Sequence, residues 1–358
     1  MNRCRLVALV AAALPLSARA QLRPAARPRC VVTAHAAVAL DDALDPRTPP
    51  AVLLLDTVTV LAWRDRADAL RVQRFAPDLR ALEDPRIIAQ PVHIFTMART
   101  PTGFALAYVE RDHDLVVARR AESLEAQNVP RVIESLTAPT AALAFAAFAG
   151  GSLVAWATPT DVRVMSLDAR GVPQGAASVV LEQPRSRALS LDPGDPITLR
   201  VDVSDPAVEP WVFTLQPDGA VASRSRWPLG ALGPVRLGDS ALTAQINPLG
   251  SPMLLRGNAV VAPAAIADPA VTPRAQLDAL AVDRDLAIAL VSDSSVGRQS
   301  LTRLMPDGSA SWLAGVRGVI QGPATFAVQA PGVVALLTRD GAHSPSRTVL
   351  QRYACVWP

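Results

Sequence analysis

The sequence predicts an all-β fold, a seven-bladed β-propeller of four-stranded antiparallel blades whose ring is closed by the N-terminal strand. Three observations lead to this prediction. A strand motif recurs seven times at intervals of about 46 residues. The last repeat has room for only three strands, and a segment near the N-terminus resembles the fourth strand of other repeats. Four short strands in a repeat of this length are typical of a propeller blade.

The repeat is recognised by an apolar strand that ends in a large side chain and precedes a polar turn. The clearest copies are Leu61-Ala62-Trp63, Leu106-Ala107-Tyr108 and Val154-Ala155-Trp156. Period-2 alternation and frequent Pro and Gly exclude a helical solenoid, whereas a two-sheet sandwich remains the alternative fold. A sandwich would not need seven similar units. The weaker copies end at Val201, Ile246, Leu290 and Leu337.

Each repeat contains an apolar first strand, the strand with the large side chain, an alternating third strand and a short fourth strand. Turns such as Asp218-Gly219 supply the positive φ angles that hairpins require. Fourth strands are expected at Arg86-Ile87-Ile88, Arg131-Val132-Ile133 and Gly318-Val319-Ile320. We expect a signal peptide at 1–20 and one propeller domain at 21–358, with blades at 51–90, 91–136, 137–183, 184–230, 231–270, 271–322 and 323–358, the last completed by 28–35.

The two ends of the chain are expected to pair. Pro28-Arg29-Cys30-Val31-Val32 resembles Pro85-Arg86-Ile87-Ile88, a fourth strand, so it would lie beside Tyr353-Ala354-Cys355-Val356. Neighbouring strands bring Cα atoms within disulfide range, and an unclosed ring would leave two strand edges exposed. The sequence therefore predicts a Cys30–Cys355 disulfide. Two unpaired buried thiols are the alternative.

On these strand motifs the chain resembles exported bacterial β-propellers, whose blades carry an apolar-Ala-Trp second strand and an alternating third strand near Asp-Gly. The resemblance covers about residues 28–358, and the fourth and fifth repeats depart from it most. It implies the fold and says almost nothing of function, because propellers include enzymes, receptors and scaffolds.

The first twenty residues have the features of a secretory signal peptide. Arg3 and Arg5 precede an apolar run from Leu6 to Leu16, and Ala18-Arg19-Ala20 fits a cleavage site. The run is shorter than the about 20 residues that span a bilayer, so a membrane anchor is the weaker alternative. Export to the periplasm, cell surface or medium is expected, which would permit the disulfide.

Charge gives no reason to expect nucleic acid or a membrane as a partner. The chain has 35 basic and 32 acidic residues, and loss of the leader's three arginines would leave 32 of each. The remaining arginines are scattered instead of forming the basic patch that nucleic acid requires. We expect a monomer without a membrane span that binds an unidentified protein or polysaccharide.

No pattern of residues indicates catalysis, a cofactor or a metal. None of the four histidines, His35, His93, His113 and His343, lies three to five residues from another. Asp192 and Asp195 could contribute to a Ca²⁺ site, but turn chemistry explains them as well. A non-catalytic binding or scaffold protein is favoured. The alternative is a glycan- or peptide-acting hydrolase or lyase with its site at the channel mouth.

The candidate binding residues lie in the turns after the second strands of blades 7, 1 and 2. These blades become neighbours when the ring closes, so the turns would form one sector of mixed charge. The alternative is that they are solvated hairpin tips in which Asp caps its own turn. The candidates are Arg64, Asp65, Arg66, Glu110, Arg111, Asp112, His113, Arg339 and Asp340.

Overall fold

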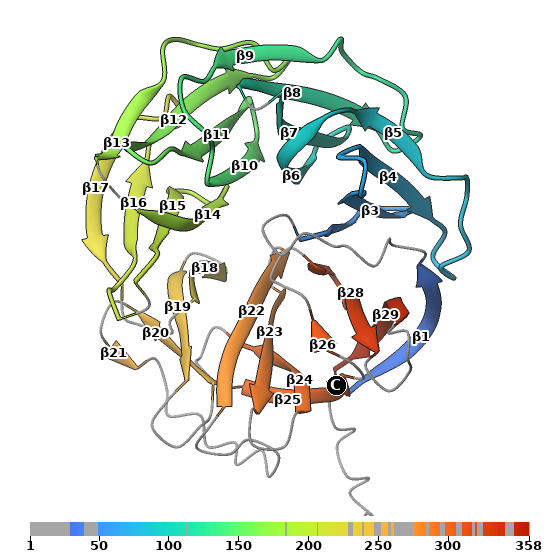
Figure 1. Ribbon diagram of the computed structural model, residues 1–358. Helices are drawn as coiled ribbons and strands as arrows, with labels where there is room; N and C mark the ends of the chain where they lie inside the picture. Colours follow the sequence, from blue (N-terminus) through green and yellow to red (C-terminus); the bar gives the residue numbers. More distant parts are fainter. Residues whose placement is uncertain are drawn as a thin grey trace, which may run out of the picture.

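The computed structural model shows an all-β chain arranged as a ring (Figure 1). The predicted signal peptide, Pro28, Asp112 and His343 lie outside the residues that it describes. The described residues are 29–38, 49–111, 113–182, 185–205, 207–227, 232–237, 240–246, 252–256, 259–260, 275–283, 286–293, 298–305, 310–316, 319–320, 325–340 and 347–357.

Blades 1, 2 and 3 each consist of four consecutive antiparallel strands. The second strand of each is almost wholly buried, because both of its faces pack against side chains of the ring. The strands are β2 (Ala51–Leu54), β3 (Thr59–Arg64), β4 (Leu70–Phe75), β5 (Arg86–Ala89), β6 (Val92–Thr100), β7 (Gly103–Glu110), β8 (Asp114–Ala121), β9 (Arg131–Ser135), β10 (Ala142–Phe148), β11 (Gly151–Ala157), β12 (Asp161–Asp168) and β13 (Ser178–Glu182).

Blades 4, 5 and 6 repeat this plan. The first strand of a blade lies nearest the centre of the ring and the fourth lies at the rim, as β14 and β17 show (Figure 1). The strands are β14 (Ser186–Asp192), β15 (Ile197–Val203), β16 (Trp211–Leu215), β17 (Val221–Arg226), β18 (Leu232–Leu237), β19 (Ser240–Ile246), β20 (Pro252–Arg256), β21 (Ala259–Val260), β22 (Ala275–Asp283), β23 (Leu286–Asp293), β24 (Arg298–Leu304) and β25 (Ala310–Val316).

A closing sheet joins the two ends of the chain. It has five strands, in the order β1-β29-β28-β26, and β27 also pairs with β28. Both β26 and β27 occupy the same edge of β28, so the innermost position of this sheet is split into two pieces. The strands are β1 (Arg29–Val38), β26 (Val319–Ile320), β27 (Phe326–Gln329), β28 (Val333–Asp340) and β29 (Arg347–Val356).

The structure corrects the expected seven four-stranded blades, because it has six of them and a separate closing sheet. Six blades have four strands, and the remaining sheet has five. Val319 and Ile320, expected as the fourth strand of blade 6, pair with β28 of the closing sheet. The fourth strand of blade 6 is β25, which pairs with β24 and is closer to it in the sequence. The chain between β26 and β27 contains Pro323, which has no N–H to donate to a ladder.

The pairing of the two ends is confirmed. β1 runs antiparallel to β29, with Cys30 opposite Cys355 and a bulge between Val32 and Ala34. The two cysteines form a disulfide with their Cα atoms 4.0 Å apart, and both are buried. The closing strand thus covers the edge of β29 that would otherwise be unpaired.

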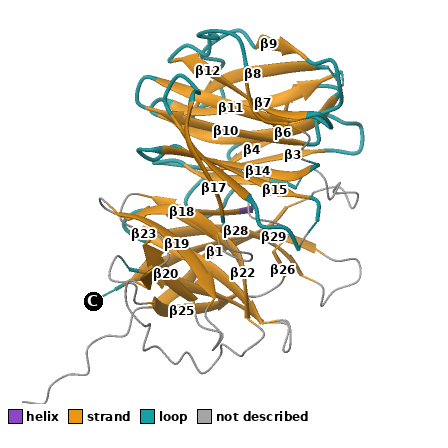
Figure 2. Ribbon diagram, turned by 90° about the vertical axis from the view of Figure 1, so that its left-hand side faces the viewer, coloured by secondary structure: helices purple, strands orange, loops and turns teal. Residues whose placement is uncertain are grey.

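The apolar core lies between adjacent sheets instead of at one centre. One cluster joins Val72 of blade 1 to Phe104 and Leu106 of blade 2, and another joins Trp156 of blade 3 to blade 2. A further cluster joins the closing sheet to blade 1. In the side view of Figure 2, blades 2 and 3 lie at one end of the ring and blades 5 and 6 at the other. This arrangement holds the turns of neighbouring blades at fixed positions.

Candidate functional site: hairpin tips and the central cavity

The turn between β3 and β4 is built around Asp65. Its side chain is buried, and Oδ1 accepts hydrogen bonds from the amides of Ala67 and Ala69, each at 2.9 Å. Oδ2 accepts from Nε of Arg71. Burial opposes ionisation of Asp65, but Arg71 and the two amides outweigh it and hold the pKa of this carboxyl below its usual value. Asp65 therefore anchors its own turn, as the hairpin-tip alternative states.

Arg64 is also engaged within the ring. Its Nη1 donates to the carbonyl oxygen of His93 at 2.9 Å and lies 3.6 Å from the carboxylate of Asp68. The amide of Val92 donates to the carbonyl oxygen of Asp68 at 2.7 Å. These contacts tie the β3–β4 turn of blade 1 to the first strand of blade 2. Arg64 therefore helps to hold this turn in place, and whether it also binds a partner stays a prediction.

The β7–β8 turn of blade 2 lies next to this turn. Its Arg111 amide donates to the carbonyl oxygen of Pro91 at 3.3 Å, and Arg111 has a positive φ of 52°. His113 is exposed, with Nε2 3.7 Å from a carboxylate oxygen of Asp114, and Glu110 is half-buried.

The structure thus brings together the turns of blades 1 and 2. We call Arg66, Glu110, Arg111 and His113 the tip surface, because these side chains are exposed or half-buried at the two turns. Asp112 lies outside the described residues, and Arg339 and Asp340 are described only as the end of β28. Whether the candidate residues bind a partner stays a prediction.

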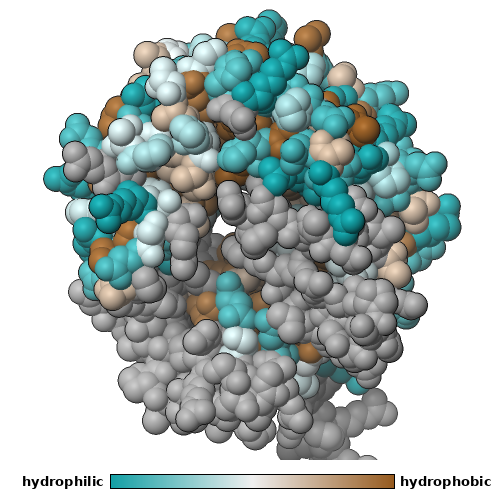
Figure 3. Space-filling model, viewed as in Figure 1, coloured by the Kyte–Doolittle hydropathy of each residue, from teal (hydrophilic) through white to brown (hydrophobic). Residues whose placement is uncertain are grey.

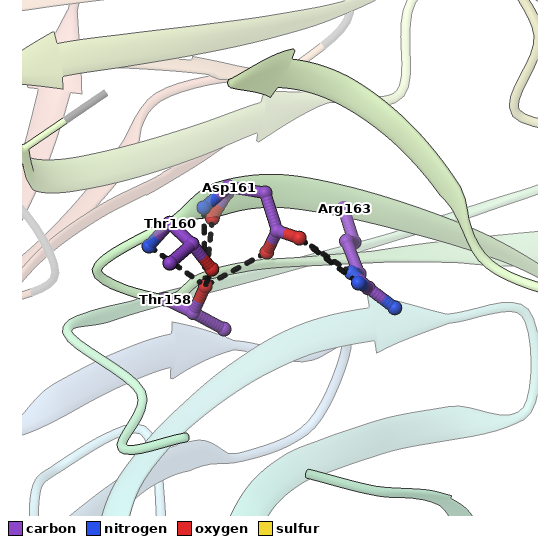
Figure 4. A network of polar contacts seen from close by, with 4 residues as sticks. All are labelled: Thr158, Thr160, Asp161 and Arg163. Atoms are coloured by element: carbon purple, nitrogen blue, oxygen red, sulfur yellow. Dashed lines mark hydrogen bonds and ion pairs between the residues drawn. The ribbon is translucent and has the colours of Figure 1, made fainter. Parts of the chain in front are cut away.

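Blade 3 contains a polar network that the sequence reasoning missed (Figure 4). Thr158 Oγ1 donates to Oδ1 of Asp161 at 2.7 Å, and Nη2 of Arg163 lies 2.9 Å from Oδ2. Burial disfavours the Asp161 carboxylate, yet Arg163 and Thr158 hold the pKa of Asp161 below its usual value.

This network and the Asp65 turn share one plan. Arg163 lies opposite Trp156 in the β11–β12 pair, as Arg71 lies opposite Trp63 in the β3–β4 pair. In both blades an aspartate of the turn binds the arginine opposite the anchoring tryptophan. In the sequence, the signal for this contact is a Trp near the end of a strand, followed by an Arg seven or eight residues later. The aspartate lies between that Trp and that Arg. A contact repeated in two blades indicates a structural role for both aspartates.

A central cavity of ≈ 640 Å³ lies toward the opposite face of the ring from these turns. Figure 3 shows an opening at the centre of the ring. Its described lining comes from the first strands of blades 1, 2, 3, 4 and 6, with adjoining turn residues, and from β27 of the closing sheet. Most of these side chains are apolar. The sequence reasoning missed this cavity because its size depends on how many sheets surround it.

The acidic pair Asp192 and Asp195, near the cavity, belongs to a turn. Oδ1 of Asp192 accepts a hydrogen bond from the amide of Gly194 at 3.0 Å. Burial raises the pKa of Asp192, and the amide only partly offsets this effect. Within the described ranges, no group of three or more His, Cys, Asp or Glu side chains is placed to hold a metal ion.

No family model and no curated protein sequence matches this chain. Its fold is similar to that of several solved structures. One is "Structure of Dos1 propeller", with a TM-score of 0.51 and 8% identity over 84% of this chain and 76% of that one. Another is a chain of "Crystal Structure of Mitotic Checkpoint Complex", with a TM-score of 0.55 and 9% identity over the full length of both.

Raptor from Chaetomium thermophilum is also similar, with a TM-score of 0.50 and 12% identity. The match covers 93% of this chain but only 29% of Raptor. At such identities the similarity establishes the fold alone. The chain is therefore a β-propeller of four-stranded antiparallel blades. In the part of the chain that the structure describes, no helix has the length and apolar character needed to cross a membrane.

Proposed function

We propose that this protein is an exported, non-catalytic propeller that binds a protein partner through the tip surface. The closing sheet acts as the seventh unit of the ring. It packs against blade 1 on the side away from blade 2. Propellers commonly serve as binding or scaffold domains, and their turns present the contact residues. The mixed charge of Arg66, Glu110, Arg111 and His113 suits a protein surface better than a uniformly charged polymer.

The observation that carries this proposal is the fixed position of two neighbouring turns. Arg64 and Asp65 use their side chains inside the ring, and Asp68 accepts a hydrogen bond from Val92 of the next blade. Arg66 and Arg111 are left exposed on turns that are already ordered. A partner would lose little conformational freedom of the propeller on binding, which favours affinity.

Two features support export. The leader-like residues at the start of the sequence have the pattern of a signal peptide. The Cys30–Cys355 disulfide supports an oxidising compartment, where such bonds persist. Mass spectrometry of the protein from its native cells should find Gln21, or its pyroglutamate form, at the N-terminus. An intact Met1 on cytosolic protein would contradict export.

The binding surface is tested by photo-cross-linking in the native cells. The photoreactive residue p-benzoylphenylalanine replaces Arg66 or Arg111, and in the control it replaces Arg170, which is exposed in the β12–β13 turn at the opposite ends of the strands. We expect one protein to be captured from positions 66 and 111 and not from 170. The Arg66→Ala, Arg111→Ala variant should then bind that purified protein at least tenfold more weakly, with an unchanged melting temperature. Capture from 170 alone, or unchanged affinity, would exclude this surface.

A further inference from the structure

The outer rim of blade 4 ends in an exposed strand. β17 is the fourth strand of this blade and lies at the rim of the ring (Figure 1). All of its residues are exposed. Within the part of the chain that the structure describes, β17 pairs with β16 alone, so its other edge is open. An open edge presents backbone N–H and C=O groups with which an extended segment of another chain can pair.

β17 also differs in charge from the fourth strands of blades 1, 2 and 3. It contains Arg224 and Arg226 and no acidic residue. On β5 of blade 1, Arg86 is paired with Glu83, with Nη2 2.9 Å from Oε2. β9 contains one arginine and one glutamate, and β13 contains a glutamate and no basic residue. Among the described residues, no carboxylate lies within ion-pair distance of Arg224 or Arg226, so both charges are available to a partner.

Trp211 of β16 holds the two guanidinium groups in place. Cζ of Arg226 lies 3.8 Å from the centroid of the Trp211 ring, and Cζ of Arg224 lies 5.8 Å from it. Trp211 itself is half-buried and packs against the apolar cluster between blades 3 and 4. A guanidinium that stacks on a ring keeps its N–H donors in its own plane, where a carboxylate can accept from them. Because these side chains are already positioned, a carboxylate would order little on binding.

The backbone groups of the same two arginines are directed to the open edge. The amide of Trp227 donates to the carbonyl oxygen of Pro210 at 3.0 Å, on the side of β16. Backbone groups alternate between the two edges of a strand, so Ser225 also faces β16, whereas Arg224 and Arg226 face away from it. A residue placed opposite either arginine would therefore meet both its backbone and its guanidinium.

We propose that β17 binds an extended acidic peptide segment of a partner protein, which adds to blade 4 as an antiparallel fifth strand. Acidic side chains at alternate positions accept hydrogen bonds from Arg224 and Arg226, and the backbone of the segment pairs with the open edge. A second copy of β17 would place arginines near arginines, so charge disfavours self-pairing. A polysaccharide or nucleic acid lacks the backbone groups of a strand. This site on blade 4 is separate from the tip surface on blades 1 and 2.

The proposal is tested by fluorescence anisotropy with the purified, disulfide-bonded protein. The probe is a short labelled peptide of alternating threonine and glutamate, and glutamine or lysine replaces glutamate in the comparison peptides. The glutamate peptide should bind at least about tenfold more tightly than the glutamine peptide, because its carboxylates make charge-assisted hydrogen bonds. Added salt should weaken it. Equal binding of the glutamate and glutamine peptides, no binding, or binding of heparin alone would overturn the proposal. No peptide should bind if the arginines only protect the edge from aggregation.

A second set of peptides tests strand addition separately from charge. In an antiparallel pair, a glutamate opposite Arg224 or Arg226 uses its own backbone N–H and C=O to bond to the open edge. N-methylation of the glutamates removes these donors and should abolish binding, whereas N-methylation of the threonines should be tolerated. Equal effects of the two modifications, or the reverse order, would overturn the antiparallel pairing.

Variants locate the site. Arg224→Gln, Arg226→Gln should weaken the glutamate peptide by about tenfold or more, with an unchanged melting temperature. Arg131→Gln, Arg170→Gln removes two exposed arginines elsewhere and is the control of equal charge, which should have no effect. If the first variant associates with itself, Arg224→Glu, Arg226→Glu keeps the edge charged and should bind the lysine peptide in preference to the glutamate peptide. An unchanged preference for glutamate in either variant would overturn the proposal.

Discussion

Aspartates in the turns of this ring serve opposite electrostatic roles. Asp65 and Asp161 each bind an arginine, and their pKa values lie below the usual value. Asp192 is half-buried with one amide donor, and desolvation raises its pKa. A carboxylate of the first kind stabilises the folded state when ionised, whereas one of the second kind opposes folding when ionised.

The first prediction concerns Asp65 and pH. Because its folded pKa is lowered, its contribution to stability is present above the unfolded pKa of about 3.9 and is lost as the pH falls through the folded value. Asp65→Asn should therefore lower the free energy of unfolding by about 1–3 kcal/mol at pH 7, where a charged hydrogen-bond acceptor is lost. The loss should be smaller at pH 3.

Urea denaturation of the wild-type and variant proteins at both pH values measures this effect. Asp84→Asn, at an exposed position of the β4–β5 connection, is the control and should change little. An equal loss at pH 7 and pH 3 would show that the charge of Asp65 does not matter and that only its shape does.

Sequence reasoning found Asp65 but could not fix its role. Arg64-Asp65-Arg66 has the composition of an exposed tip, and only the turn backbone shows that the carboxylate faces the amides of Ala67 and Ala69. Arg64 was equally ambiguous, because its partner, the carbonyl of His93, belongs to the next blade. Arg66 remains exposed as expected. Contacts between blades are not encoded in any local pattern, so these assignments required the structure.

At the level of elements, some second strands begin at or just after a glycine that lies against the third strand. A Cβ atom on Gly103, at the start of β7, would collide with the carbonyl oxygen of Arg120 on β8. A Cβ atom on Gly332, just before β28, would likewise collide with the carbonyl oxygen of Cys355 on β29. Gly151, at the start of β11, is placed in the same way against the carbonyl oxygen of Leu167 on β12, so three sheets share this use of glycine.

The second prediction follows from Gly103. Its φ of 147° is unfavourable for other residues, and the carbonyl of Arg120 is backbone that cannot move aside cheaply. Gly103→Ala should lower the free energy of unfolding by about 1–3 kcal/mol or more. Gly315→Ala on β25 is the matched control, since a Cβ atom there meets nothing within 4 Å.

Thermal and urea melts of the two variants provide the comparison. Gly315→Ala should be neutral or slightly stabilising, because alanine restricts the unfolded chain. Similar melting of both variants would mean that the backbone around Gly103 relaxes and that the close approach is not a constraint.

Elements with strong local patterns were predictable, and elements defined by long-range pairing were not. The anchoring segments that end at Trp63, Tyr108 and Trp156 all lie in second strands. Val319 and Ile320 look like any other short β-branched strand, so the sequence could not show that they pair with β28 instead of blade 6. Two residues carry too little periodicity to select a partner strand.

At the scale of the whole molecule, closure of the ring depends on strands from the two ends of the chain. The sequence predicted this pairing because two independent features agreed, the fourth-strand motif around Cys30 and the missing strand beside Cys355. The cavity, by contrast, arises only when all the sheets are assembled. The sequence alone does not show that residues such as Phe148 and Leu191 face a channel.

The third prediction concerns the disulfide. The bond closes a loop over a sequence separation of 325 residues, so its loss should lower the free energy of unfolding by about 2–4 kcal/mol. The Cys30→Ser, Cys355→Ser variant should also aggregate more readily, because fraying of β1 exposes the edge of β29. A non-reducing peptide map should show the two cysteine peptides linked in the wild-type protein.

The measurement is a comparison of urea melts for the wild type and the double variant. The single variants serve as controls and should each lose about as much as the double variant. A double variant as stable as the wild type would mean that the β1–β29 ladder holds the ring without the covalent bond.

Placement of this bond beside both ends gives the ring an unusual mechanical property. A tension applied between the two ends would pass through Cys30 and Cys355 and would not reach the blades between them. Under load the oxidised molecule would act as a short, inextensible link. Reduction would release a hidden length, since 325 residues extend to about 1,100 Å at about 3.4 Å per residue.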